Sequence, residues 1–135
     1  MTNWCTNSIT ITGDEETIKT ILKRLGTITN PAREIIFETM VGRNPNESNL
    51  KRFGTMWDVS HENTKINFND LMITMKFSTV SFPPCYFCQH LSNEYDVKVE
   101  LIYSIPNINF TGKEIYYKNS VESFEFENNL LSLHV

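Results

Sequence analysis

Between residues 8 and 26 the hydrophobic period changes from that of a strand to that of a helix, and this change constrains the fold most strongly. Ile9 and Ile11 alternate with serine and threonine, which is typical of a strand with one buried face. Asp14 is then a suitable helix N-cap, and Gly26 a suitable C-cap. Between these caps the apolar residues recur at helical spacing, at Ile18, Ile21, Leu22 and Leu25. The sequence therefore predicts a strand followed by an amphipathic helix.

Further strands are predicted where apolar and polar residues alternate again, at residues 70–79, 97–104 and 110–118. Residues 33–41 are rich in β-prone side chains and predict a second strand. Residues 42–52 have the composition of a polar loop.

A second helix is predicted over residues 83–95, with Ser81 as a candidate cap. Its apolar stripe consists of Pro84, Phe87, Cys88, Leu91 and Tyr95. Residues 55–60 predict an extended stretch, and residues 120–135 predict an edge strand or a packed extension.

This order of elements favours one α+β domain of the ferredoxin-like, split-βαβ type. In this plan an antiparallel or mixed sheet carries two helices on one face. A length of 135 residues suits one domain and is short for two. We expect residues 1–119 to form the ferredoxin-like domain, and residues 120–135 to form a C-terminal extension packed on it.

Charge and cysteine content indicate the expected compartment. The chain has 12 basic and 16 acidic residues, and its net charge of -4 opposes non-specific attraction to nucleic acid or anionic lipid. No apolar run approaches the roughly 18–20 residues that span a bilayer, and the first residues do not resemble a signal peptide. An odd number of cysteines, three, is typical of a reducing compartment. We expect a cytoplasmic protein without a membrane partner.

The sequence offers little support for catalysis. Cys85 and Cys88 form a Cys-x-x-Cys at a predicted helix start, but a redox domain would place that motif after its first strand. No nucleophile-elbow, phosphate-loop or dinucleotide-binding motif occurs. Only that cysteine pair has the spacing of metal ligands. We expect no enzymatic activity, cofactor or metal; an enzyme that uses Cys85, Cys88 and His90 remains an alternative.

Three stretches resemble one known family. "NWCTNSITITG" at residues 3–13, "FGTMWD" at 53–58 and "FSTVSFPP" at 77–84 are similar to signatures of the YubB-type ferredoxin-like domain, found in plasmids and bacteriophages. The match extends from residue 3 to about residue 117. The resemblance implies a ferredoxin-like fold and a mobile-element origin, and it brings no established enzymatic activity.

Nucleic-acid binding is a second alternative, because RNA-recognition domains stack bases on aromatic side chains of an open sheet face. The residues expected opposite the apolar face are all polar: Thr10, Thr12, Thr74, Lys76, Lys98 and Glu100. Together with the negative net charge, this disfavours direct binding of nucleic acid.

The stretch "FGTMWDV" at residues 53–59 has two interpretations. In the first it is a structural loop, with Trp57 anchored against the sheet and its indole N–H paired. In the second it belongs to a protein-binding surface, since tryptophan and arginine dominate such surfaces. Trp4 has the same two interpretations. The residues expected at a partner-binding surface are Arg52, Trp57, Asp58, Glu34, Glu38, Glu122, Glu125 and Glu127.

Resemblance to a mobile-element family and the lack of a recognisable active site lead to one functional expectation. The chain is expected to be a phage or plasmid accessory protein that binds and inhibits a host defence factor in the bacterial cytoplasm. A CRISPR effector nuclease is the most concrete target. The acidic residues would then face a basic groove of that target.

Overall fold

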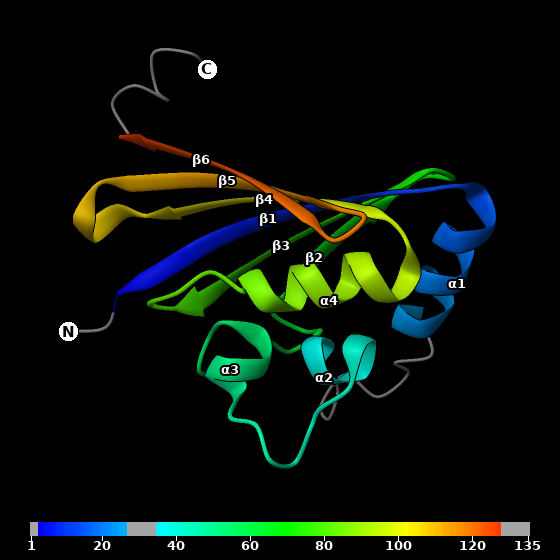
Figure 1. The fold of residues 1–135 in the computed structure, drawn as a ribbon, viewed down its shortest axis with the longest axis horizontal. Helices are drawn as coiled ribbons and strands as arrows, with labels where there is room; N and C mark the ends of the chain where they lie inside the picture. Colours follow the sequence, from blue (N-terminus) through cyan, green and yellow to red (C-terminus); the bar gives the residue numbers. More distant parts are fainter. Residues whose placement is uncertain (1–2, 27–34, 128–135) are drawn as a thin grey trace.

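Six strands form one antiparallel sheet in the order β2-β3-β1-β4-β5-β6 (Figure 1). The computed structural model describes residues 3–26 and 35–127. The strands are β1 (Trp4–Thr12), β2 (Lys65–Phe68), β3 (Met72–Val80), β4 (Lys98–Ile105), β5 (Phe110–Tyr117) and β6 (Ser120–Glu127). The protein is therefore an α+β fold, as the sequence predicts.

Four α-helices lie in the described part of the chain, all on one side of the sheet (Figure 1). They are α1 (Glu15–Gly26), α2 (Ile36–Val41), α3 (Asn49–Phe53) and α4 (Cys85–Tyr95). Helix α4 packs directly on β4 and β5, whereas α2 contacts both α1 and α4, and α3 contacts α4. A single 3-10 turn, η1 (Pro106–Ile108), joins β4 to β5. No described helix covers the other face of the sheet.

The strongly periodic segments fold as predicted. The carboxylate of Asp14 caps α1 by accepting the Thr17 N–H at 2.8 Å; of the predicted apolar face Ile18, Ile21 and Leu25 are buried and Leu22 is partly buried. Helix α4 buries Phe87, Cys88 and Leu91, the centre of its predicted stripe. Ser81 does not cap this helix, because its backbone has a φ of 65° and Pro84 occupies the N-cap position.

The prediction of a second strand over residues 33–41 is wrong, because Ile36–Val41 is helix α2. Its buried residues Ile36, Phe37, Met40 and Val41 fit one face of a short helix as well as they fit a strand. The loop predicted over residues 42–52 ends in α3, whose Ser48 side chain accepts the Lys51 N–H at 3.2 Å. Residues 55–60 form no strand and make only an isolated bridge between Ile35 and Ser60.

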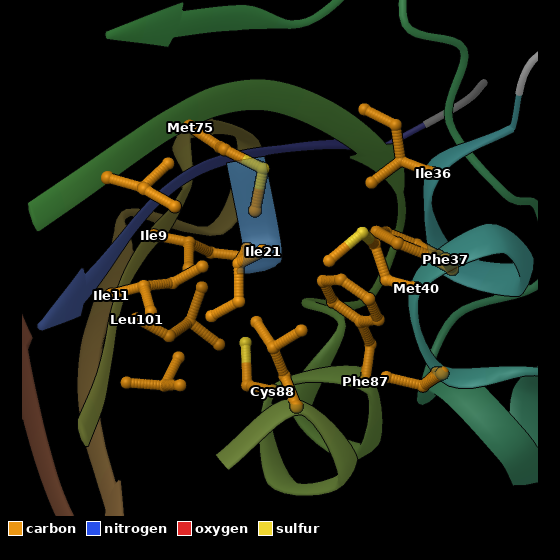
Figure 2. Packing of buried hydrophobic residues seen from close by; sticks show 14 of the residues in the cluster. Ile9, Ile11, Ile21, Ile36, Phe37, Met40, Met75, Phe87, Cys88 and Leu101 are labelled. Carbon is orange, nitrogen blue, oxygen red and sulfur yellow. The ribbon is translucent and has the colours of Figure 1, made fainter. Parts of the chain in front are cut away.

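One apolar core fills the space between the sheet and the helices (Figure 2). Side chains from β1, β3 and β4 meet those of α1, α2 and α4 there. Phe37 of α2 lies at the centre of an aromatic group, with its ring centroid 4.3 Å from that of Phe87 and 5.5 Å from those of Phe53 and Phe77. Helix α2 thus joins α3, α4 and the sheet in one core.

Strand β6 is the edge of the sheet and pairs with β5 along its whole length, from Ser120 to Glu127. The end of the predicted extension, residues 128–135, lies outside the described residues. The division at residue 119 stays a prediction. None of the helices in the described ranges has the length and apolar character that a bilayer span requires.

Candidate interaction surface

One end of the sheet brings together the start of β1, the end of β3, the start of α4 and helix α3 (Figure 1). Gly54 makes this junction possible. It ends α3 with a left-handed φ of 92°, and its N–H donates to Leu50 O at 3.0 Å. A Cβ at this position would lie only 3.0 Å from Cys85 N and 3.2 Å from Pro83 O. Glycine is therefore required by conformation and by the close approach of α4.

The next residue, Thr55, fixes the loop to the sheet. Its side chain is fully buried, and its hydroxyl donates to Val80 O at the end of β3 over 3.3 Å. Phe53, which precedes Gly54, is buried in the core. With these two side chains turned inward, Met56 and Trp57 point to solvent.

Both tryptophans of the chain are more than half exposed: Trp4 by 54% and Trp57 by 63%. The prediction that Trp57 is anchored against the sheet is wrong, because Phe53 and Thr55 occupy the buried positions of this loop. Met56 in the same loop as Trp57, and Phe82 and Tyr86 after β3, add three exposed apolar side chains. We name this set the Trp57 surface; it consists of Trp4, Met56, Trp57, Phe82 and Tyr86.

Backbone contacts tie these segments together. Ser81 N–H donates to Asn3 O at 2.6 Å, which holds the residues before β1 beside the β3–α4 loop. Trp4 and Asp58 line the same surface hollow of about 510 Å³. The Trp57 surface is therefore formed by several segments that are remote in sequence rather than by one loop.

Asp58 faces inward and serves helix α2. Its carboxylate accepts the N–H groups of Phe37 at 2.8 Å, Glu38 at 3.0 Å and Val59 at 2.7 Å. Burial raises the pKa of this carboxyl above its ordinary value, while the three hydrogen bonds act in the opposite direction. Asp58 is thus an N-terminal cap supplied from 20 residues further along the chain.

Arg52 holds the other end of α2. Its guanidinium donates to the carbonyl oxygens of Val41 and Gly42, the latter at 3.2 Å, and also contacts His90 Nε2 at 3.2 Å. Two of the residues predicted at a partner surface, Arg52 and Asp58, are therefore engaged within the protein. Trp57, which lies between them in the chain, is exposed.

The predicted acidic residues that the structure describes lie on different elements. Glu38 lies in α2, and its N–H is bound by Asp58. Glu122 and Glu125 lie on β6, at the sheet edge opposite β2 and β3. For Glu127 the structure gives only its backbone pairing with Phe110, and Glu34 lies outside the described residues.

The three cysteines lie in an environment that keeps them protonated. Cys85 Sγ donates to Glu114 Oε1 at 2.7 Å, while Ser123 donates to the other oxygen of that carboxylate at 3.2 Å. Burial is the main cause that raises the pKa of Cys85 to about 12 and that of Cys5 to about 11, and it raises the pKa of Cys88 as well. Such thiols are poor nucleophiles and poor metal ligands. Within residues 3–26 and 35–127, no group of three or more His, Cys, Asp or Glu side chains could hold a metal ion.

Sequence reasoning missed Met56, Phe82 and Tyr86. For Met56 and Phe82, which lie in loops, no local pattern indicates exposure; for Tyr86 a signal exists, since it lies off the apolar stripe of the predicted helix. Sequence reasoning also missed the aromatic side chains of β5 and β6 that face away from the helices. For Tyr117 and Phe124 the sequence does contain a signal. Successive side chains of a strand point to opposite faces, and both residues alternate with residues of the helix-covered face, which indicates that they lie on the open face.

No family model matches this chain, and no curated protein matches it. Its structure is similar to the crystal structure of the protein api92 from Yersinia pseudotuberculosis, described with the family DUF1281. The TM-score is 0.68 at 11% sequence identity, and the likeness covers 93% of this chain and 98% of that chain. At this identity the likeness shows the fold alone.

Proposed function

We propose that this chain is a non-catalytic binding protein that docks on another protein through the Trp57 surface. The observation that carries the proposal is the exposure of both tryptophans at one end of the sheet. Tryptophan supplies a large apolar area and is enriched among the residues that dominate protein–protein binding energy. Exposed large apolar side chains that gather at one end of a molecule are typical of interaction sites.

The cost of this exposure supports a functional role. Burying an aromatic side chain of this size is worth a few kcal/mol at about 25 cal/mol per Å² of apolar area. At the Trp57 surface that gain is not realised within the described fold, while Phe37, Phe53 and Phe87 are fully buried nearby. A partner that covers Trp4 and Trp57 would supply the missing burial.

We also propose that the core of the fold is ferredoxin-like. The order β1-α1-β2-β3-α4-β4 and the strand order β2-β3-β1-β4 support this assignment, because both match a split-βαβ unit. In this reading α2 and α3 are an insertion between α1 and β2, and β5 and β6 extend the sheet beyond β4.

The proposed partner is a host defence factor, and a CRISPR effector nuclease is the target to test first. Its support is the resemblance of residues 3–13, 53–58 and 77–84 to a family of plasmids and bacteriophages. In this role the chain would act in the cytoplasm of a bacterial host. Glu122 and Glu125 on β6 would supply a separate acidic contact to a basic groove.

The test combines capture with inhibition. The tagged chain is used to recover partners from host lysate, and each nuclease effector identified is purified and assayed for DNA cleavage with increasing amounts of the chain. Trp57→Ala is the test variant. Phe68→Ala is the matched control, because Phe68 is 66% exposed and lies on β2, remote from the Trp57 surface.

We expect the wild-type chain and Phe68→Ala to bind and inhibit the effector, and Trp57→Ala to lose at least about 2 kcal/mol of binding free energy, or about 30-fold in affinity. Equal binding by Trp57→Ala and the wild-type chain would refute the proposed surface. Binding without any effect on cleavage would refute the inhibitory role, and recovery of nucleic acid alone would refute both.

A further inference from the structure

The sheet face that no described helix covers has a charge pattern unlike that of the whole chain. Lys65 of β2 and Lys76 of β3 are directly opposed in the antiparallel register, and both are exposed. Like charges in opposed positions destabilise a sheet. Neither lysine forms an ion pair within the described residues. This arrangement has an electrostatic cost that a bound anion would remove.

The lysine pair continues into a row that crosses all six strands. Lys76 is opposed to Ser8, Ser8 to Ile102, Ile102 to Lys113, and Lys113 to Phe124. Five inter-strand spacings give the row a length of about 24 Å. It is thus long enough to follow several units of an extended polymer.

Aromatic and aliphatic side chains lie at the β5–β6 end of this row. Phe124 ends the row and is 42% exposed, Ile102 on β4 is separated from it by Lys113 and is also exposed, and Tyr117, four residues beyond Lys113 on β5, is 44% exposed. Lys118 adds a cation here, with its Nζ 5.2 Å from the centroid of the Tyr117 ring. Flat apolar side chains beside cations are the two components of a surface on which unpaired bases stack.

Between these two ends the face is hollowed and rich in hydroxyl groups. The hollow has a volume of about 480 Å³, and its lining includes Thr6, Ser8, Ser78, Ser104 and Lys76. Hydroxyl groups and a lysine are suitable donors to phosphate oxygens and sugars.

We propose that this open face binds single-stranded nucleic acid. Four lysines lie on it, at positions 65, 76, 98 and 113, against two glutamates, at 100 and 122, in a chain whose formal net charge is -4. One of these charges is satisfied internally, since Lys113 Nζ lies 3.9 Å from Glu100 Oε2. The positive excess is therefore concentrated at the Lys65–Lys76 end, with the stacking side chains at the other end. A single strand suits both ends of the face, because its phosphates can bind the lysines and its unpaired bases are free to stack on the aromatic side chains.

The test measures the anisotropy of fluorescein-labelled 15-nucleotide poly(dT) and poly(U) with the full chain at 50 and 200 mM salt. The test variants are the double substitution Lys65→Gln/Lys76→Gln and the double substitution Tyr117→Ala/Phe124→Ala. The control is Lys19→Gln/Lys23→Gln, which makes the same charge change on the exposed side of α1. All substituted side chains are exposed, and a thermal melt of each variant verifies folding.

Each phosphate contact contributes about 0.7 to the slope of log K against log salt for single strands. We expect the Lys65/Lys76 variant to reduce that slope by about 1.4 and to weaken binding about tenfold or more, while the α1 control changes binding less than about twofold. The Tyr117/Phe124 variant should weaken binding at both salt concentrations without changing the slope. Trp57→Ala should leave this binding unchanged, because Trp57 lies in the loop after α3; Trp4 belongs to both surfaces, since its alternation with Cys5 places it on the open face.

Several results would overturn the inference. They are no binding at 50 mM salt, equal losses in the Lys65/Lys76 variant and the α1 control, or an affinity for duplex DNA equal to or tighter than that for the single strand. Competition by poly-glutamate as strong as competition by unlabelled poly(dT) would assign the face to acidic polypeptides instead.

Discussion

Arg52 Nη1 lies 3.2 Å from His90 Nε2, in a contact that joins α3 to α4. Because a guanidinium can only donate, the imidazole accepts through Nε2 and is neutral in this arrangement. The same arginine donates to Val41 O and Gly42 O at the end of α2. One pair of side chains therefore connects three helices that support the Trp57 surface.

This contact predicts a pH dependence of stability. Burial, followed by the charge of Arg52, lowers the pKa of His90 below its ordinary value of 6.5. The unfolded chain therefore binds a proton at His90 more readily than the folded chain does. The contribution of His90 to the free energy of unfolding is thus present above pH 6.5 and is lost as the pH falls through the lowered pKa. Urea unfolding of the wild-type chain and of His90→Gln from about pH 7 to about pH 5 measures it. The glutamine keeps an acceptor but does not titrate, so its stability should fall less; equal slopes would contradict the prediction.

Removal of the Asp58 carboxylate should destabilise the protein. Asp58→Ala leaves the N–H groups of Phe37 and Glu38 without their partner, and we expect a loss of about 1–3 kcal/mol in the free energy of unfolding. Asp70→Ala, in the exposed turn between β2 and β3, should change it by less than about 0.5 kcal/mol. Chemical denaturation of both variants compares them, and similar midpoints would exclude the capping role.

Gly54→Ala should cost about 1–3 kcal/mol, because an alanine must adopt a φ of 92° and its Cβ would press on Cys85 N. Gly26→Ala is the matched control. An added methyl group at residue 26 would have no neighbour within 4 Å and needs no positive φ, so stability should stay the same or rise by up to about 1 kcal/mol. Thermal melts of the two variants give the comparison. A tolerated alanine at residue 54 would mean that α3 and α4 separate easily.

Trp57→Ala should change stability by less than about 0.5 kcal/mol, since the side chain is 63% exposed. Phe53→Ala, four residues earlier, should cost about 3–5 kcal/mol, since its ring is buried against Phe37. Urea titrations are followed by far-UV circular dichroism, because Trp57→Ala removes part of the tryptophan fluorescence. A large loss in the Trp57 variant would show that this residue is part of the core after all.

The thiols should react slowly in the folded protein. With a pKa of about 12, Cys85 at pH 8 carries about 1,000-fold less thiolate than an unperturbed thiol, and the thiolate is the nucleophile. Reaction with Ellman's reagent should therefore be slow for all three cysteines, and fast once concentrated urea unfolds the chain. Rapid modification of one thiol in the native protein would revive the alternative of a reactive Cys/His site.

Part of the fold is encoded locally. The β1–α1 unit, β3, α4, β4 and β5 are predictable, because alternation and helical spacing each run over eight or more residues there. Helix α2 is not predictable, because six residues with Ile36, Phe37, Met40 and Val41 buried satisfy either period. The deciding interactions come from Asp58 and Arg52, which are remote in sequence.

The sequence by itself determined an α+β chain with one amphipathic strand–helix unit at its start and a tryptophan-containing loop in its middle. Only the tertiary structure decided that Trp57 points to solvent while Asp58 points inward, and that Lys65 opposes Lys76 on the open face. The physical reason is that periodicity specifies which side of an element is buried, whereas exposure at a loop and pairing across strands depend on which remote segments occupy the adjacent space.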